Sequence, residues 1–572
     1  MAFQISPGVL VQEVDLTTVV PSVLTTAGAY AGAFAWGPAN TIVQVTSETD
    51  LVKYFGGPDS NTATSFFTAA SFLSYGNNML VVRAADASSL NATANTQATI
   101  NVPNKSIFQA TYLNQNNANT YGPFISRYSG ALGNSLSVSV IDAGAGSTAF
   151  NSWTYSSYVN GIPGTSAQAI ALNGNSTAND ELHIVVIDAG GLFTGNKGQV
   201  LEVYQYVSKG FDAKDPLGNS NYYKNKLFND SKYIYGIDPV NYATTSATWG
   251  QTLANTTYAT LPTAVTTQLV GGTYTTPSDA AKVTAFSYFT NPNLVDISLV
   301  VTGDADTTVQ QYVIDNIVTT RKDCVAFISP PSSNVVNQAG SEVTNITAWN
   351  TALARSTSYA FADSGWKYMF DKYNNTYRWI PLNGDMAGLC VNTDHVRDAW
   401  WSPAGFNRGN LKNVIKLAWN PNQAQRDSLY AQGINPVATF QGQGTVLFGD
   451  KTLQAKPSAF DRVNVRRLFI VLEKAIARAS QYSMFEFNDS FTQAQFVALV
   501  TPFLRDIQGR RGITDFKVVC DSTNNTPQVI DSNKFVGDIY IKPARSINFI
   551  QLNFVAVGTG VSFTEVVGQT GV

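Results

Sequence analysis

The sequence predicts a mixed α/β protein of several domains, with an α/β core built from the N- and C-terminal parts, β-rich domains inserted between them, and extended terminal arms. The length of 572 residues exceeds what one core accommodates, since single cores stop growing at roughly 250 to 300 residues. Hydrophobic residues make up 44% of the chain, which is enough to fill several cores. Helix and strand patterns alternate towards both ends, whereas the middle consists of short β-like runs between turn residues.

The first element is a strand close to the N-terminus. After a Pro-Gly turn signal the chain alternates with a period of two, which places Val9, Val11 and Glu13 on one face. A strand so near a chain end needs a partner to be ordered. We therefore expect residues 1–20 to form an extended arm.

Residues 21–85 predict the first part of the α/β core. A β-like run begins at Ala27, two helical stretches follow, and the run "NMLVVRAAD" indicates a strand. Gly76 is expected to end the second helix, because glycine adopts the left-handed conformation past the last turn at little steric cost.

Residues 86–290 differ in character from the segments on either side. Polar stretches such as "NQNNANTYG" and "NGNSTAND" separate short β-like runs such as "SLSVSVIDAG" and "LHIVVIDAG". We expect one or two β-rich domains here, inserted into the core and carried on its outside, because surface insertions are well tolerated.

Residues 291–555 return to the core pattern and include an inner C-terminal domain. The runs "DISLVVTG" and "CVAFISPP" flank a helical stretch, which predicts a βαβ-like unit with a parallel strand pair. Residues 458–482 place apolar side chains, Val465, Leu468 and Leu472 among them, at helical spacing. The other face of that helix carries basic side chains: Arg466, Arg467, Lys474 and Arg478.

A second helix is expected just after residue 490. Thr492 and Gln495 match a capping box, and Phe491 and Phe496 are spaced as a hydrophobic staple. Pro502 lies inside this helix and is expected to kink it. Two glycines in "GRRGITDF" end the helix, and the chain then returns to β-like runs.

The last element mirrors the first. Residues 561–567 alternate as a strand with Val561, Phe563 and Glu565 on one face, and they follow a Gly-Thr-Gly hinge. We expect residues 556–572 to form a second arm. An isolated strand leaves its backbone groups unpaired, so both arms are expected to add to a β-sheet of another copy of the chain.

The composition favours a surface that other chains cover. Charged residues make up 13% of the sequence, about half of the usual ~25%, and the net charge is −3. Low charge weakens the repulsion that keeps proteins apart, and a nucleic-acid binder is usually basic. We expect no nucleic-acid partner.

We expect no insertion into a membrane and no signal peptide, because the sequence has neither a long apolar run nor a basic start followed by an apolar segment. Three widely spaced cysteines indicate folding in a reducing cytoplasm.

No arrangement of residues predicts catalysis, a metal site or a cofactor. The two histidines, His183 and His395, lack partners at ligand spacing. The nearest match to a phosphate-binding loop is "GTVLFGDKT", in which Asp450 stands where the lysine belongs and would repel phosphate. Asp304 and Asp306 lack the spacing of a calcium loop and indicate a polar turn. We therefore expect a protein that is not an enzyme.

Several segments, taken in order, resemble the tail sheath proteins of contractile-tailed bacteriophages of the myovirus type. Near the N-terminus these are "SPGVLVQEVDLTTVV", "GAFAWGPANTIVQVTSETDLVKYFG" and "NMLVVRA". The likeness continues through "SRYSGALGNSLSVSV" in the inserted region and through "LNGDMAGLCVNTDHVRDAWWSPAGFNRG", "NVRRLFIVLEKAI" and "FEFNDSFTQAQF" in the C-terminal half. It touches nearly the whole chain.

The resemblance implies a structural subunit that stacks on itself as six-membered rings or a six-start helix around a tail tube. Such a sheath is metastable when extended and contracts when the baseplate triggers it, which drives the tube through the host envelope. The implied partners are other copies, the tail tube protein, and the baseplate and tail terminator proteins. The implied location is the virion tail, after assembly in the host cytoplasm.

A cluster of arginines in the C-terminal part of the chain fits this interpretation. Such a run is usually a solvated helix face, but it also suits an acidic partner surface. With the resemblance, we expect it to face the tube. Its members are Arg466, Arg467, Arg478, Arg505, Arg510 and Arg511.

Three alternatives stay open at this point. The chain could be the sheath of a related contractile injection system or bacteriocin, which has the same architecture. An adhesin that binds glycans is suggested by the aromatic, Asn-rich insertion. An enzymatic function is the third alternative, and its candidate site is the altered phosphate-binding loop.

Overall fold

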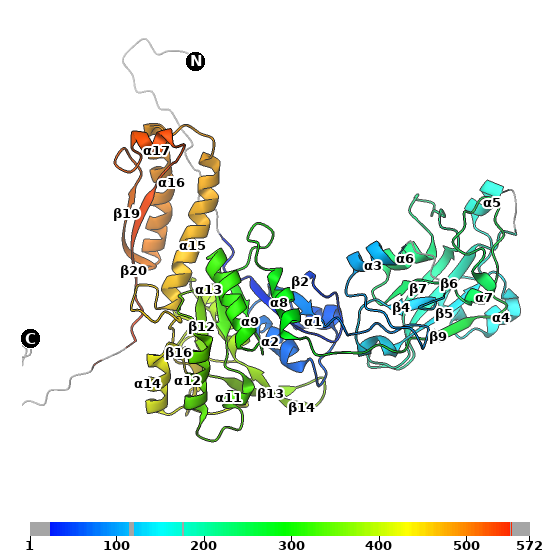
Figure 1. Ribbon diagram of the computed structural model, residues 1–572, viewed down its shortest axis with the longest axis horizontal. Coiled ribbons are helices and arrows are strands. Elements are labelled where there is room, and N and C mark those ends of the chain that lie inside the picture. The colour runs from blue at the N-terminus through cyan, green and yellow to red at the C-terminus, as the bar shows by residue number, and fades with distance from the viewer. Residues whose placement is uncertain (1–22, 114–118, 174–176, 549–550, 552–572) are drawn as a thin grey trace, which may run out of the picture.

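The computed structural model describes residues 23–113, 119–173, 177–548 and 551 (Figure 1). Its central body is a seven-stranded sheet with the order β16-β12-β11-β10-β1-β3-β2. All neighbouring strands are parallel except β2 and β3. The strands are β1 (Gly28–Ala33), β2 (Ile42–Val45), β3 (Met79–Ala84), β10 (Leu299–Val301), β11 (Val325–Ile328), β12 (Ala360–Asp363) and β16 (Ile434–Asn435).

Side chains of the sheet alternate between two apolar layers. Tyr30, Val81 and Phe327 belong to one layer, while Ala31 and Val82 belong to the other. Helices α1 (Glu48–Phe55), α2 (Ala63–Leu73) and α13 (Asn383–Val396) contribute to the first layer. Helices α8 (Asp279–Ser287), α9 (Thr307–Tyr312), α12 (Glu342–Leu353) and α14 (Gln423–Ala431) contribute to the second. Both faces are therefore covered, as parallel strands require.

The expected βαβ unit is present. β10 and β11 pair in parallel, and α9 continues through a π-helical stretch (Val313–Val318) into α10 (Thr319–Arg321) between them. Smaller elements complete the body: α11 (Ser332–Val335), β13 (Trp366–Asp371), β14 (Thr376–Pro381), β15 (Lys416–Leu417), β17 (Val437–Phe440) and β18 (Gly444–Leu447).

A β-rich lobe lies to one side of the body (Figure 1). Its antiparallel sheet β7-β6-β5-β9 consists of β5 (Leu136–Asp142), β6 (Glu181–Asp188), β7 (Gln199–Ser208) and β9 (Val265–Gln268). β4 (Phe124–Ser126) pairs with β8 (Ile234–Gly236). Short helices surround these sheets: α3 (Lys105–Thr111), α4 (Gly146–Ser152), α5 (Ala167–Asn173), α6 (Tyr223–Asp230) and α7 (Tyr242–Thr245).

The chain enters and leaves this lobe through adjacent segments. Leu90 and Thr273 form an antiparallel bridge, with backbone hydrogen bonds of 3.1 Å in both directions. Helix α8 falls within the expected insertion 86–290 but packs on the core sheet, because Phe286 and Phe289 are buried in the layer that holds Val82. The lobe therefore ends before α8 rather than at residue 290.

A second lobe, built from the C-terminal elements, projects from the other side of the body (Figure 1). It contains the hairpin of α15 (Val463–Ser480) and α16 (Ser490–Gly509), then β19 (Ile513–Val519), α17 (Pro527–Asp531) and β20 (Asp538–Pro543). β19 and β20 form a two-stranded antiparallel sheet that packs with both helices around a separate apolar cluster. The mixed α/β, multi-domain fold class is thus confirmed.

The start of α16 differs from the expectation. The Asp489 carboxylate caps the helix by accepting a hydrogen bond of 2.8 Å from the Thr492 backbone N–H, so Thr492 is not the cap. Gln493 donates to the Asn488 side chain at 2.8 Å, which puts a polar pair where the staple would be. Phe491 is left 71% exposed. Pro502 does lie inside the helix.

Candidate functional site

The altered phosphate loop is a strand followed by a buried carboxylate. Gly444–Leu447 is β18, which pairs with β17, as its apolar residues indicate. Asp450 is 2% exposed. Lys451 donates to the Tyr430 carbonyl at 2.7 Å, so its ammonium group is already engaged. This geometry opposes phosphate binding.

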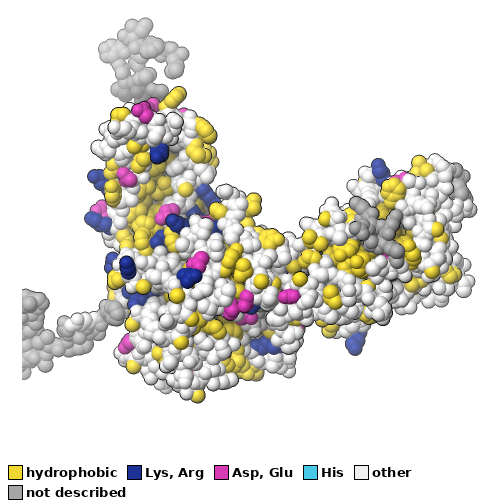
Figure 2. Space-filling view, viewed as in Figure 1, with side chains coloured by type: hydrophobic (Ala, Val, Ile, Leu, Met, Phe, Trp, Pro, Cys, Tyr) yellow, Lys and Arg dark blue, Asp and Glu magenta, His cyan; other side chains and the backbone are white. Residues whose placement is uncertain are grey.

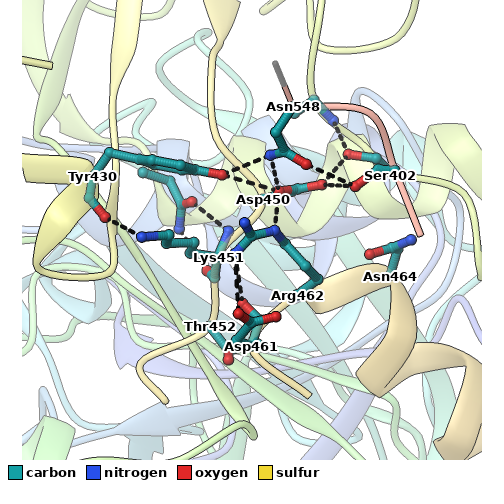
Figure 3. A network of polar contacts seen from close by, with 12 residues as sticks. Ser402, Tyr430, Asp450, Lys451, Thr452, Asp461, Arg462, Asn464 and Asn548 are labelled. Carbon is teal, nitrogen blue, oxygen red and sulfur yellow. Dashed lines mark hydrogen bonds and ion pairs between the residues drawn. The ribbon is translucent and has the colours of Figure 1, made fainter. Parts of the chain in front are cut away.

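Asp450 instead centres a polar network that joins the body to the C-terminal lobe (Figure 3). Ser402 and Ser546 each donate to one carboxylate oxygen at 2.9 Å. Asn548 donates to the other oxygen at 3.2 Å, and the Arg462 guanidinium lies 3.4 Å from it. The segment that follows β20 is therefore fixed to the body at Ser546 and Asn548.

His183 and Asp306, one of the acids of the expected polar turn, have structural roles. His183 is buried, bonds to the Gly161 carbonyl at 2.8 Å and accepts from the Tyr206 N–H at 3.1 Å, and burial lowers its pKa. His395 lies exposed in the last turn of α13. Asp306 caps α9 by accepting from the Val309 N–H at 3.1 Å. In the described part of the chain, no group of three or more His, Cys, Asp or Glu could hold a metal ion.

Two of the six arginines that were expected to face the tube, Arg466 and Arg467, are buried inside the subunit. Arg467 forms an ion pair of 2.6 Å with Asp394, and both side chains are buried. Arg466 donates to the Ser358 hydroxyl at 3.0 Å, and its guanidinium stacks on Tyr359. Partners on α13 and before β12 permit this burial, because they replace the lost hydration of each guanidinium.

The other four arginines reach the surface. Arg478 pairs with Asp296, and Arg510 pairs with Asp398. Arg505 is exposed on α16, and within the described residues it has no ion pair. Arg511 lies over the Trp401 ring, 5.6 Å from its centroid. The six arm residues all lie outside the described residues: Val9, Val11, Glu13, Val561, Phe563 and Glu565.

The sequence interpretation missed a cleft of about 1030 Å³ at the junction of body and C-terminal lobe. Trp401 lies in it, with the guanidinium groups of Arg397 and Arg408 each 5.4 Å from the ring centroid. The tryptophan pair within "HVRDAWWSPAGFNRG" is a signal in the sequence, but Arg511 comes from a segment more than a hundred residues later.

An exposed apolar loop between α15 and α16 was also missed. Phe485 is fully exposed, and Tyr482 and Phe487 are each 84% exposed among the described residues. Figure 2 shows hydrophobic side chains on the surface of this lobe. The run "YSMFEF" is apolar enough to have suggested such a feature.

Comparison with known proteins assigns the chain to a family. Three family models match: "Tail sheath protein Gp18 domain III N-terminal region" at residues 25–84, "Phage tail sheath protein central domain" at 268–453, and "Phage tail sheath C-terminal domain" at 455–556. The "Tail sheath protein" of Vibrio phage KVP40 is 35% identical to this chain, with 99% of this chain and 100% of that protein aligned. The chain belongs to the phage tail sheath family. The tail sheath protein of Enterobacteria phage T4 is 33% identical over 99% of this chain and 100% of its own length.

Solved structures of sheath proteins share the fold. The sheath tail protein from Listeria innocua has a TM-score of 0.52 at 11% identity and covers 92% of this chain and 97% of its own. The one from Desulfitobacterium hafniense has a TM-score of 0.50 at 10% identity, covering 90% and 94%.

The tail sheath chain is a structural subunit of a contractile phage tail. The three matched ranges leave residues 85–267 uncovered, and these residues form most of the β-rich lobe. Among the described residues, no helix has both the length and the apolar character needed to cross a membrane.

Proposed function

We propose that the chain polymerises around a tail tube as six-membered rings or a six-start helix, in an extended state that contracts when a baseplate releases it. Contraction drives the tube through the host envelope. The partners in this proposal are other copies, the tube protein, and the baseplate and tail terminator proteins, with assembly in the host cytoplasm. The subunit does mechanical rather than enzymatic work and needs no cofactor.

The observation that carries this proposal is the two-stranded sheet of the C-terminal lobe. β19 pairs only with β20 among the described strands, so each strand offers an outer edge to another chain. The segment after β20 is fixed to the body by Ser546 and Asn548, so its exit point stays defined while the lobes move. We assign residues 1–20 and 556–572 as arms that add to the β19–β20 sheet of neighbouring copies.

The remaining segments take positions around these arms. Residues 21–85 and 291–555 are proposed to form the core with the C-terminal lobe innermost, and the lobe within 86–290 to lie outermost. Figure 1 supports this arrangement, since the two lobes project from different sides of the body.

The tube contact is proposed to use the exposed arginines Arg478, Arg505 and Arg510, of which Arg505 has no ion pair within the described chain. Arg505→Glu is expected to weaken co-assembly with the tube. The difference from the native chain should shrink at high salt, because salt also screens the attraction of the native arginine. If the native chain and the Arg505→Glu variant co-assemble equally well with the tube at low salt, this contact is contradicted.

The experiment for the whole proposal is electron microscopy of the purified chain in EDTA without nucleotide. Hollow tubes or rings are expected. A chain that stays monomeric until ATP or a metal ion is added would overturn the proposal.

A further inference from the structure

The exposed loop between α15 and α16 combines aromatic and acidic side chains. Its fully exposed or nearly exposed rings belong to Tyr482, Phe485 and Phe487. Residues 481–491 carry Glu486 and Asp489 and no basic residue. Apolar side chains gathered in this way on a soluble protein mark a surface that another chain covers. We call residues 481–491 the aromatic loop.

The cleft at the junction of the lobes has the opposite character. Four arginines and two aspartates line it, and Asp450, one of the two, is neutralised by Arg462. None of the four arginines forms an ion pair in the described part of the chain. They are Arg408, Arg426, Arg511 and Arg545.

The cleft also offers apolar surface that suits aromatic rings. Trp401 and Phe448 line it, and Phe448 is 42% exposed. Arg426 lies 5.9 Å from the centroid of the Phe448 ring. Burial, together with the nearby charge of Arg397, lowers the pKa of Arg408, so an incoming carboxylate would relieve repulsion between these cations. A ligand with rings and carboxylates is therefore complementary to this cleft.

The loop cannot reach the cleft of its own subunit. The loop precedes α16, whereas Gln508 and Arg511 at the far end of α16 line the cleft. A helix of 20 residues is about 30 Å long, so the aromatic loop and the cleft are separated by about the length of α16. The contact must join two copies.

We propose that the aromatic loop of one sheath subunit docks in the junction cleft of a second copy. Phe485 and Phe487 enter beside Trp401 and Phe448, and Glu486 pairs with Arg511. Loop and cleft are different surfaces of one chain, so this head-to-tail contact generates a ring or a helical filament rather than a two-fold dimer. The inference rests on the proposed self-assembly and adds to it a contact that the terminal arms do not provide.

Charge exchange tests the pairing. Glu486→Arg and Arg511→Glu should each raise the concentration for half-maximal tube formation by about tenfold, and the double variant should return it close to that of the native chain. Lys456→Glu is the matched control and should have little effect on tube formation, because this exposed residue lies outside the loop, the cleft and the proposed tube contact. Circular dichroism shows whether each variant folds.

The outcomes separate the inference from the proposed function. If the native chain forms no tubes, self-assembly itself fails. If it forms tubes and the single variants assemble like the native chain, or the double variant is as weak as the two singles combined, only the docking is overturned.

A photo-crosslinking side chain in place of Phe485 provides a second readout in assembled tubes. Crosslinks to residues 401–448 of another copy are expected. Crosslinks to the terminal segments, to the same copy, or only to added tube protein would overturn the docking.

Discussion

The buried ion pair between Arg467 and Asp394 connects α15 to α13 inside the protein. Arg467→Ala would leave the Asp394 carboxylate buried without its cation, which is expected to cost about 3 to 5 kcal/mol of stability. Arg478→Ala removes a pair in which the arginine is 43% exposed, and should cost at most about 1 kcal/mol. Urea denaturation of both variants checks this, and equal losses would contradict the assignment.

Asp363 predicts how stability depends on pH. Burial raises its pKa to about 8, although the Ser329 hydroxyl donates to it at 2.6 Å. In the unfolded chain its pKa is about 3.9, so between these values the folded state holds more protons and stability falls as pH rises. Asp363→Asn removes this titration. Its melting temperature relative to the native chain should therefore increase from pH 5 to pH 8, and a constant difference would contradict the prediction.

For single residues, the sequence predicted the environment where neighbours in sequence determine it. The prediction failed where residues far away in sequence determine it. Pro502 was expected inside a helix that begins after residue 490, and it lies inside α16. Arg466 and Arg467 were expected to face the tube, but both are buried inside the subunit. Their partners, Asp394 and Ser358, lie far from them in sequence and could not be identified from spacing.

At the scale of elements, the segment after β20 depends on Asp450. Asp450→Ala would remove the acceptor of Ser546 and Asn548 and leave Arg462 without its buried partner, which is expected to cost about 1 to 3 kcal/mol. Hydrogen exchange at residues 544–548 should accelerate. Asp461→Ala, which removes a carboxylate 3.6 Å from the same arginine, is the control and should leave this exchange slow.

Elements with strong periodicity were predictable, but their boundaries were less so. The parallel β10–β11 pair and the helix α15 follow directly from apolar spacing. The start of α16 was misplaced because "NDSFTQ" contains four residues of types that cap helices well, and the sequence does not show that Asn488 and Gln493 bond to each other. The cleft could not be predicted, since it forms only when segments that are far apart within residues 400–548 meet.

At the scale of the molecule, the β-rich lobe is expected to be dispensable for polymerisation. Leu90 and Thr273 lie side by side, so a short Gly-Ser linker can replace residues 91–272 while α8 stays on the core sheet. The shortened chain is expected to fold with some loss of stability, because buried Arg83 donates to the Ser129 carbonyl of the lobe at 2.6 Å. Tubes of reduced outer diameter are expected in the microscope, and a folded chain without tubes would contradict this.

The central claim is that terminal arms link the subunits by adding strands to the β19–β20 sheet of their neighbours. The most direct measurement is electron microscopy of three purified chains: the native chain, one lacking residues 1–16 and one lacking residues 561–572. The account predicts tubes for the native chain and folded monomers for both truncated chains, because each truncation removes a strand that supplies the backbone pairing between copies. Contractile tubes of normal length from either truncated chain would contradict the shared-strand link for that arm.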